Sequence, residues 1–127
     1  SDVYKRQATV YEDSHFTVIL DVNPATKGHC LIIPKEHFDN IYDLDGETAG
    51  KLFALATCIA RAMKDALKCD GLNLVQNNGE VAGQTVNHFH LHLIPRYEGD
   101  GLNLNWPQQE ISGEQLEEIR QSIKKSI

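Results

Sequence analysis

Hydrophobic and polar residues alternate in several short runs along the chain, which is the pattern of strands with one buried face. The first two runs are separated at Asp13 and Ser14, which indicates a hairpin, and the third ends at Pro34. In the last run, Phe89 and Leu91 lie between polar neighbours. The predicted strands are residues 8–13, 15–22, 29–34, 72–77 and 88–97.

A different spacing, at intervals of three and four, predicts one long helix over residues 45–68. Asp45 is a suitable N-cap and Gly71 a suitable C-terminal stop. Near the end of the chain, Ser112 and Gln115 have the spacing of a capping box and precede a short amphipathic helix. The fold class is therefore α+β: a mainly antiparallel five-stranded sheet with one long helix and a short C-terminal helix.

Length and charge narrow the classes of function. The chain has 127 residues, the size of a single domain, and a net charge of −6. No basic run or patch is present, which argues against a nucleic-acid polymer or an anionic membrane as partner, although a small anionic ligand needs only a local site. Three cysteines without a C-x-x-C pair indicate a reducing compartment, and we expect a cytoplasmic protein.

Residues 1–7 are set apart from the rest. They are polar, lack the apolar core of a signal peptide, and have the sequence that a sequencing adapter encodes in one reading frame. We expect residues 1–7 to be an adapter-derived or disordered tail and residues 8–127 to form the single domain.

The most informative feature is a row of three histidines, His88, His90 and His92, out of six in the chain. On a strand, side chains two residues apart share a face, so the three imidazoles would lie along one track. Three interpretations of such a row are open: histidines on a solvated sheet face with no further role, a metal site, or a site for chemistry on a phosphate.

Strand geometry argues against one metal ion bound by all three rings. At about 3.3 Å per residue, the Cα atoms of His88 and His92 lie about 13 Å apart. Two nitrogens on one zinc ion are at most about 4.2 Å apart. A site with two histidines and a carboxylate stays possible, although no acidic residue adjoins the row.

Phosphate chemistry fits the row better. Neutral imidazole is a competent nucleophile, and neighbouring rings can hold different protonation states at pH 7. The loop before the row contains Gly79 and Gly83, which permit close backbone approach, and Gln84 and Thr85, which bring polar hydrogens toward an anion.

These residues resemble the histidine-triad (HIT) family, whose pattern is His-x-His-x-His followed by two apolar residues. The chain has His88-Phe89-His90-Leu91-His92-Leu93-Ile94, preceded by Gly83-Gln84-Thr85, and residues 20–37 upstream match as well. The resemblance covers nearly everything after residue 7 and implies a HIT-like fold.

The resemblance also implies roles for the histidines. His90 would attack the α-phosphorus of a nucleotide and form a covalent nucleotidyl-histidine, which water would then hydrolyse. His92 would donate to phosphoryl oxygens, and His88 would orient the nucleophile. His29 matches a fourth histidine that packs against the triad. His37 also fits a family position, and we interpret it as structural.

Further implied residues form the nucleotide pocket. Asp21 would accept the ribose hydroxyls and Val22 would contact the base. Around the phosphate, the resemblance implies Asn77, Gly83, Gln84 and Thr85. The partner would be a purine nucleotide or nucleotide conjugate, and the long helix with its neighbouring strand would pair two chains into a homodimer.

The resemblance implies that activity requires no cofactor. Many bacterial members carry a structural zinc held partly by cysteines of an N-terminal segment; nothing in this sequence matches that segment, so we do not expect zinc.

The predicted activity is hydrolysis or transfer at the α-phosphate of nucleoside phosphoramidates or related conjugates. Two alternatives stay open: a dinucleoside polyphosphate hydrolase, and a nucleotide-binding adaptor without catalysis. Gly83-Gln84-Thr85 and Ile94-Pro95-Arg96 favour the polyphosphate branch of the family, whereas Asp21 favours the phosphoramidate branch.

Overall fold

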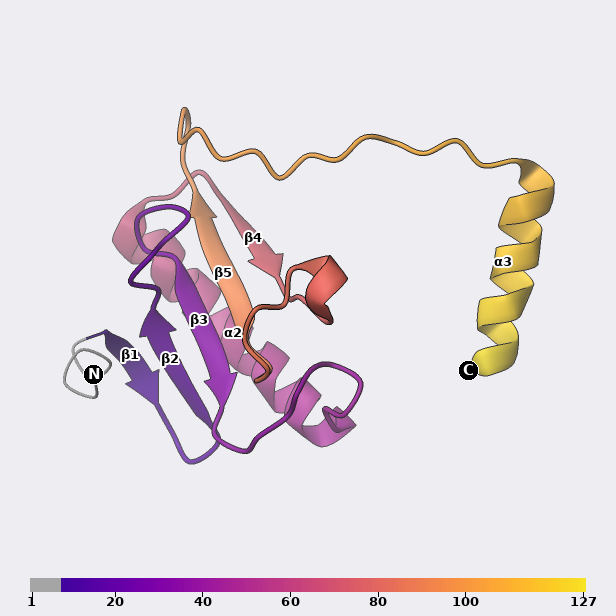
Figure 1. Ribbon diagram of the computed structural model, residues 1–127. Coiled ribbons are helices and arrows are strands. Elements are labelled where there is room, and N and C mark those ends of the chain that lie inside the picture. Colours follow the sequence, from indigo (N-terminus) through magenta and orange to yellow (C-terminus); the bar gives the residue numbers. More distant parts are fainter. Residues whose placement is uncertain (1–7) are drawn as a thin grey trace.

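The computed structural model describes residues 8–127; the tail predicted for residues 1–7 lies outside the described residues. Element labels follow Figure 1. The elements are β1 (Thr9–Glu12), β2 (Phe16–Leu20), β3 (Cys30–Pro34), α2 (Gly46–Leu67), β4 (Gly71–Val75), the 3-10 turn η1 (Glu80–Ala82), β5 (Leu91–Arg96) and α3 (Gly113–Ser126).

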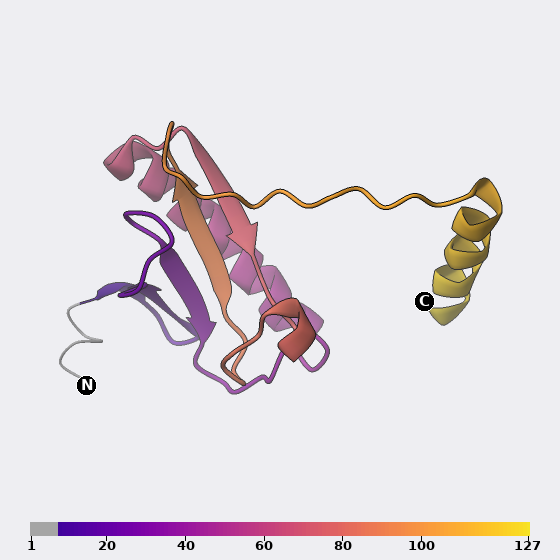
Figure 2. The same cartoon turned by 45° about the horizontal axis from the view of Figure 1, so that its top comes forward.

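The strands form one antiparallel sheet in the order β1-β2-β3-β5-β4. Helix α2 lies along one face of this sheet, whereas α3 stands away from it at the end of an extended segment (Figures 1 and 2). The predicted α+β class, with one long and one short helix, is confirmed.

The core lies between the sheet and α2. Alternate residues of the three central strands point toward the helix and are buried, and α2 supplies residues at intervals of three and four. The buried strand residues are Phe16, Val18, Cys30, Ile32, Leu91 and Leu93, and those of α2 are Leu52, Ala56, Ile59 and Met63.

Helix α2 begins as predicted and ends slightly differently. The Asp45 side chain accepts a hydrogen bond from the Thr48 amide at 3.0 Å, which caps the first turn. The C-cap is Lys68, whose φ of 54° is left-handed, and Gly71 is instead the first residue of β4. The stop predicted at Gly71 is therefore wrong, because a lysine adopts the left-handed cap three residues earlier.

The fifth strand is shorter than predicted. It begins at Leu91 rather than at residue 88, so only His92 of the histidine row is within the strand. The Phe89 amide donates to the Phe38 carbonyl at 2.7 Å, in the loop that follows β3, and so the chain before Leu91 pairs with that loop instead of with a strand. The alternation of buried residues nevertheless continues through Phe89, Leu91 and Leu93.

The C-terminal capping box is confirmed. The Ser112 side chain accepts from the Gln115 amide, and the Gln115 side chain accepts from the Ser112 amide, both at 3.1 Å. Among the described residues, neither helix is long and apolar enough to cross a membrane.

We predict that Leu93→Ala lowers the free energy of unfolding by about 2–5 kcal/mol, because Leu93 has no exposed surface and its removal leaves a cavity. Leu20→Ala is the matched control: Leu20 is exposed, and its truncation should cost less than about 1 kcal/mol. Urea unfolding followed by circular dichroism measures both. Equal losses in the two variants would contradict the assigned core.

Candidate functional site

Pairing of β3 with β5 brings two distant histidines together. His29 immediately precedes β3, and His92 lies in β5 opposite Leu31. The Nε2 atom of His29 is 2.9 Å from the Nδ1 atom of His92, a hydrogen-bonding distance. The predicted packing of His29 against the triad is therefore present in the structure.

The backbone determines which nitrogens of these rings carry protons. The Ala25 amide can only donate, and it lies 3.0 Å from His29 Nδ1, so that nitrogen accepts. Neutral His29 then carries its proton on Nε2 and donates it to His92 Nδ1. Because Nδ1 of His92 accepts this bond, the single proton of neutral His92 is on Nε2, where it can be donated to a ligand.

His90 has the opposite arrangement. Its Nδ1 atom lies 2.8 Å from the carbonyl oxygen of His88, which can only accept, so Nδ1 carries the proton. Neutral His90 therefore has an unprotonated Nε2 with a free lone pair, the form in which imidazole is a nucleophile. The rings of His90 and His92 are edge to face, with centroids 4.9 Å apart.

His88 is held from two sides. Its Nε2 donates to the Pro34 carbonyl at 3.0 Å, and its Nδ1 lies 3.1 Å from Nδ1 of His37. His37 in turn contacts the Asp39 carboxylate at 2.7 Å. The sequence prediction treated His37 as structural and missed this contact with the triad. No local pattern reveals it, because the two histidines are 51 positions apart.

Burial keeps two of the histidines neutral at pH 7. It lowers the pKa of His92 to about 4, and the nearby rings of His90 and His29 contribute to the same shift. Burial also lowers the pKa of His29, against the opposing effect of the Asp21 carboxylate. The pKa of the Cys30 thiol is raised to about 11 by burial, so Cys30 is protonated and not a nucleophile at pH 7.

Asp21 and Val22, predicted to contact the nucleoside, lie just after β2. One carboxylate oxygen of Asp21 accepts from the Asn23 amide at 2.9 Å, and the other is 3.8 Å from Nε2 of His29. The side chain of Val22 is 48% exposed. Asp21 is thus beside the histidines, and Val22 is accessible to a ligand.

The side chain of Gln84 was predicted to face a bound anion, but its polar atoms contact the protein backbone instead. Its amide nitrogen donates to the carbonyls of Asp39 and Val86, and its amide oxygen accepts from the Gly79 amide. These bonds use the side chain to tie together the loops around the triad. In this structure the Gln84 side chain holds the loop of residues 79–86 in place, and its amide hydrogens are already donated to two backbone carbonyls.

The other residues predicted around the phosphate are Asn77, Gly83 and Thr85. Gly83 has a φ of 97°, which a side chain would strain, and a Cβ there would lie 3.6 Å from the Asn77 amide nitrogen. Asn77 is half-buried, whereas Thr85 is exposed, so its hydroxyl is accessible to a ligand. Gly83 and Asn77 are therefore neighbours.

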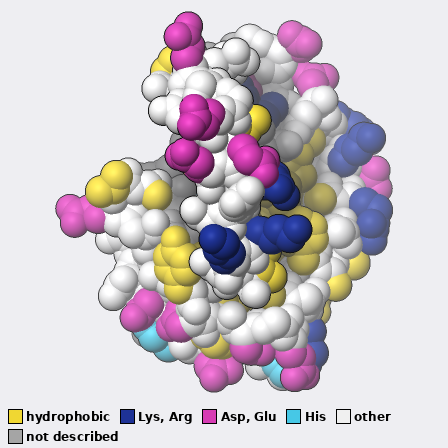
Figure 3. Space-filling model, turned by 90° about the vertical axis from the view of Figure 1, so that its right-hand side faces the viewer, with side chains coloured by type: hydrophobic (Ala, Val, Ile, Leu, Met, Phe, Trp, Pro, Cys, Tyr) yellow, Lys and Arg dark blue, Asp and Glu magenta, His cyan; other side chains and the backbone are white. Residues whose placement is uncertain are grey.

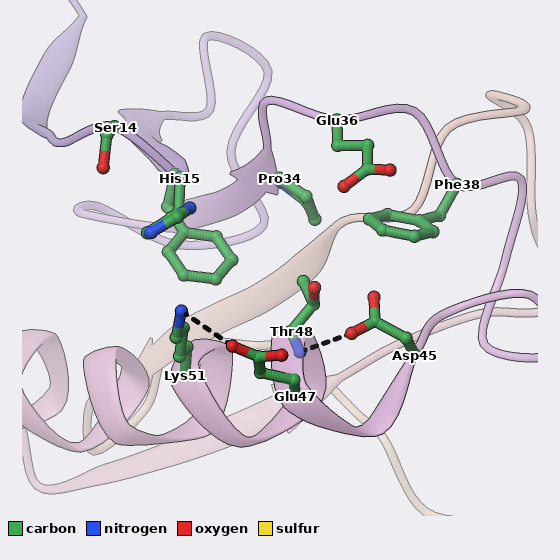
Figure 4. A pocket seen from close by; sticks show the side chains of 10 residues that line it. Ser14, His15, Pro34, Glu36, Phe38, Asp45, Glu47, Thr48 and Lys51 are labelled. Atoms are coloured by element: carbon green, nitrogen blue, oxygen red, sulfur yellow. Dashed lines mark hydrogen bonds and ion pairs between the residues drawn. The ribbon is translucent and has the colours of Figure 1, made fainter.

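A cavity of about 620 Å³ lies elsewhere, between the start of α2 and the ends of β2 and β3. Figure 4 shows Lys51 paired with Glu47 and Asp45 bound to Thr48 on the helix side of this cavity. None of the predicted site residues lines it. Lys51 and Glu47 form an ion pair there, and we do not place the function in this cavity.

Comparison with known proteins identifies the family. The sequence profile of the HIT domain matches residues 4–99. "Protein hit" of Bacillus subtilis is 45% identical over 94% of this chain and 85% of its own length. The chain belongs to the HIT domain family. The adenosine 5'-monophosphoramidase HNT1 of Saccharomyces cerevisiae is 38% identical over 88% of this HIT protein and 69% of the yeast protein.

Solved structures agree with the fold. A HIT family protein from Bacillus anthracis has a TM-score of 0.88 and 46% identity, covering 94% of this chain and 87% of its own. A HIT family member from Bacillus subtilis has the same TM-score, 45% identity and the same coverage.

One group of side chains in the described part of this HIT protein could be considered for a metal ion: Asp21, His29 and His92. A zinc-bound histidine triad protein from Mycobacterium smegmatis is 39% identical, with a TM-score of 0.71, over 94% of this chain and 88% of its own. In the present structure the histidine nitrogens are 2.9 Å apart, shorter than the roughly 3.4 Å between two nitrogens bound tetrahedrally to zinc. This geometry fits a shared proton rather than a metal.

We predict that removal of metal leaves this HIT protein intact. Dialysis against a strong chelator should not change the thermal unfolding midpoint, because the nitrogens of His29 are already used by Ala25 and His92. Elemental analysis of the dialysed protein is the accompanying measurement. A midpoint that falls on chelation and returns with Zn²⁺ would contradict the expected absence of zinc.

The low pKa of His92 predicts a pH-dependent stability. Between pH 6.5 and about 4 the unfolded state binds a proton at this ring that the folded state does not, so the free energy of unfolding falls as the pH is lowered through that window. We expect His92→Gln to reduce this loss by about 1 kcal/mol after solvent screening is allowed for. Urea unfolding at pH 7 and pH 5 measures it; identical pH dependence in both proteins would refute the assignment.

Proposed function

We propose that this HIT protein hydrolyses nucleotide conjugates at the α-phosphate, with His90 as nucleophile. The observation that carries the proposal is the hydrogen bond from His90 Nδ1 to the His88 carbonyl, which leaves the lone pair on Nε2. The carbonyl also stabilises the positive charge that develops on the ring when Nε2 forms a bond.

In the first step, the Nε2 lone pair of His90 forms a bond to the α-phosphorus, and the bond from phosphorus to the leaving group breaks. An amine leaving group takes up a proton from the solvent as it departs. In the second step, water attacks the phosphorus, the bond to His90 breaks, and the nucleoside monophosphate is released. The attacking water releases one proton to the solvent, which replaces the proton that the amine took up, so one water is consumed in each turnover.

His92 is proposed to stabilise the charge on the phosphoryl oxygens. Its Nδ1 is occupied by His29, so its single proton is on Nε2, and its low pKa keeps the ring a neutral donor. For the nucleoside we propose Asp21 as the ribose contact and Val22 as the contact with a purine base. Thr85 is proposed to donate to the phosphate, since its side chain is exposed.

A nucleoside phosphoramidate is the favoured substrate. The yeast relative HNT1 is named an adenosine 5'-monophosphoramidase. The match with this chain covers 69% of the length of HNT1. Asp21 also favours a phosphoramidate substrate, because an acidic residue at this position is typical of the phosphoramidate branch of the family. A dinucleoside polyphosphate hydrolase and a non-catalytic adaptor are the alternatives.

We also propose a cytoplasmic homodimer paired through α2 and β4. Strand β4 is at one edge of the sheet and has no charged residue or proline to prevent pairing. Leu74 on this strand and Phe53 on α2 are both exposed apolar side chains. Two copies related by a two-fold axis would cover both.

The decisive prediction concerns His90→Asn. Hydrolysis of adenosine 5'-phosphoramidate and of a diadenosine polyphosphate should be followed side by side by mass spectrometry, with chelator present. We expect the wild type to cleave the phosphoramidate faster, and His90→Asn to lose at least about 10³-fold in rate while still binding adenine nucleotide.

His15→Asn is the matched control, because His15 is exposed near the β1–β2 turn and outside the site. It should retain wild-type turnover. Wild-type turnover by His90→Asn would rule out the nucleophile. Faster cleavage of the polyphosphate would change the substrate class, and nucleotide binding without any turnover would favour the adaptor.

A further inference from the structure

The cavity at the start of α2 has no role in the proposed hydrolysis. Its volume of about 620 Å³ is within the range of roughly 300–1,000 Å³ that is usual for small-molecule pockets. Three buried residues, Phe16, Pro34 and Phe38, contribute an apolar part of its lining. We call this space the α2 cavity. It is large enough for a small molecule with an apolar body.

Charged side chains give the α2 cavity an excess of negative charge. The described part of its lining includes the carboxylates of Glu36, Asp45 and Glu47 but only one ammonium group, that of Lys51. Lys51 is 3.3 Å from Glu47, and one oxygen of Asp45 accepts from the Thr48 amide. In Figure 4, Glu36 points from the loop after β3 toward α2, and it has no ion pair within the described part of the chain. The cavity therefore attracts a cation.

The N-terminal end of α2 opposes this preference only in part. The aligned peptide dipoles of a helix are equivalent to about half a positive charge at its N-terminus. Asp45 at the N-cap and Glu47 in the first turn place two full negative charges at the same end. The carboxylates therefore outweigh the helix dipole, and the field in the α2 cavity still favours a positive group.

The arrangement of these carboxylates fits an organic cation better than a metal ion. A metal ion needs ligand atoms that converge on one point. Within residues 8–127, the one group of three candidate ligands that converge within 4.8 Å is Asp21, His29 and His92, which lies outside the α2 cavity. The carboxylates of the cavity are instead dispersed around an apolar wall. Such a lining suits an ammonium or guanidinium group on an apolar body, and aromatic rings add to the attraction.

Two residues of the cavity wall also hold the histidine row. The Pro34 carbonyl accepts from Nε2 of His88 at 3.0 Å, and the Phe38 carbonyl accepts from the Phe89 amide at 2.7 Å. The α2 cavity therefore lies against the segment that carries the first histidines of the triad. A ligand in the cavity contacts residues that position His88, so its binding is detectable at that residue as well. In Figure 3 acidic side chains and histidines are neighbours at the lower end of the molecule.

We propose that the α2 cavity binds a small organic cation, with an ammonium or guanidinium group on an apolar body. The positive group lies near the Glu36 carboxylate, and the apolar body lies against Phe16, Pro34 and Phe38. The inference goes beyond the proposed hydrolysis and does not depend on it, because none of the residues proposed to act on the nucleotide lines this cavity.

The test compares three probes that have nearly the same shape and different charges. Phenethylamine is a cation at pH 7, 2-phenylethanol is neutral and phenylacetate is an anion. Each is titrated into the full chain while the backbone amide signals are followed by NMR. We expect phenethylamine to shift the amides of Phe38, Thr48 and His88, and to bind at least about threefold more tightly than 2-phenylethanol. Phenylacetate should leave these amides unchanged.

Two substitutions have opposite expected effects. Glu36→Gln removes the unpaired carboxylate and should weaken the binding of phenethylamine by at least about threefold. Lys51→Gln removes the competing ammonium group and releases Glu47, so it should strengthen the binding by about the same factor. Glu118→Gln is the matched control, because Glu118 is an exposed residue of α3, which stands away from the cavity, and this variant should bind as the wild type does.

Equal affinities for phenethylamine and 2-phenylethanol would overturn the proposal, and so would wild-type affinity in Glu36→Gln. Shifts centred on His90 and His92 instead of Thr48 would place the amine at the triad and would likewise overturn it. A Lys51→Gln variant that binds phenethylamine more weakly would contradict the assigned charge preference. Each of these results leaves the hydrolase proposal intact, because turnover is measured separately.

Discussion

The antiparallel pairing of β3 with β5 is the interaction on which the site depends. It places Leu31 opposite His92 and so brings His29, which is 63 positions away in sequence, to 2.9 Å from His92. The same two strands supply fully buried residues to the core under α2. The free energy that packs the core therefore also holds the histidines in position, and the site needs no separate scaffold.

Hydrogen bonds to the backbone then give each imidazole a distinct state. An amide that can only donate makes His29 Nδ1 an acceptor, and a carbonyl that can only accept makes His90 Nδ1 a donor. Identical side chains thus present an unprotonated Nε2 at His90 and an N–H donor at His92, which are the states that the proposed mechanism uses. Burial reinforces the difference, because the lowered pKa of His92 keeps its ring uncharged.

The outer parts of the molecule have a different physical basis. Strand β4 and Phe53 on α2 are not covered by the described core, and each presents groups that would be stabilised by a second chain. The site is formed by contacts within one chain, whereas these surfaces are suited to contacts between chains. Catalysis and assembly can accordingly be examined by separate substitutions.

By itself, the sequence determined the order and type of the main elements, because helix spacing, capping residues and strand alternation are local patterns. The start of α2 after Asp45, the capping box at Ser112 and the buried Phe89–Leu91–Leu93 alternation were all predictable. Only the tertiary structure decided that β5 starts at Leu91, since Phe89 bonds to a loop from another part of the chain. The contacts of Gln84 with Asp39 and of His37 with His88 likewise join residues more than 40 positions apart, and no local pattern encodes them.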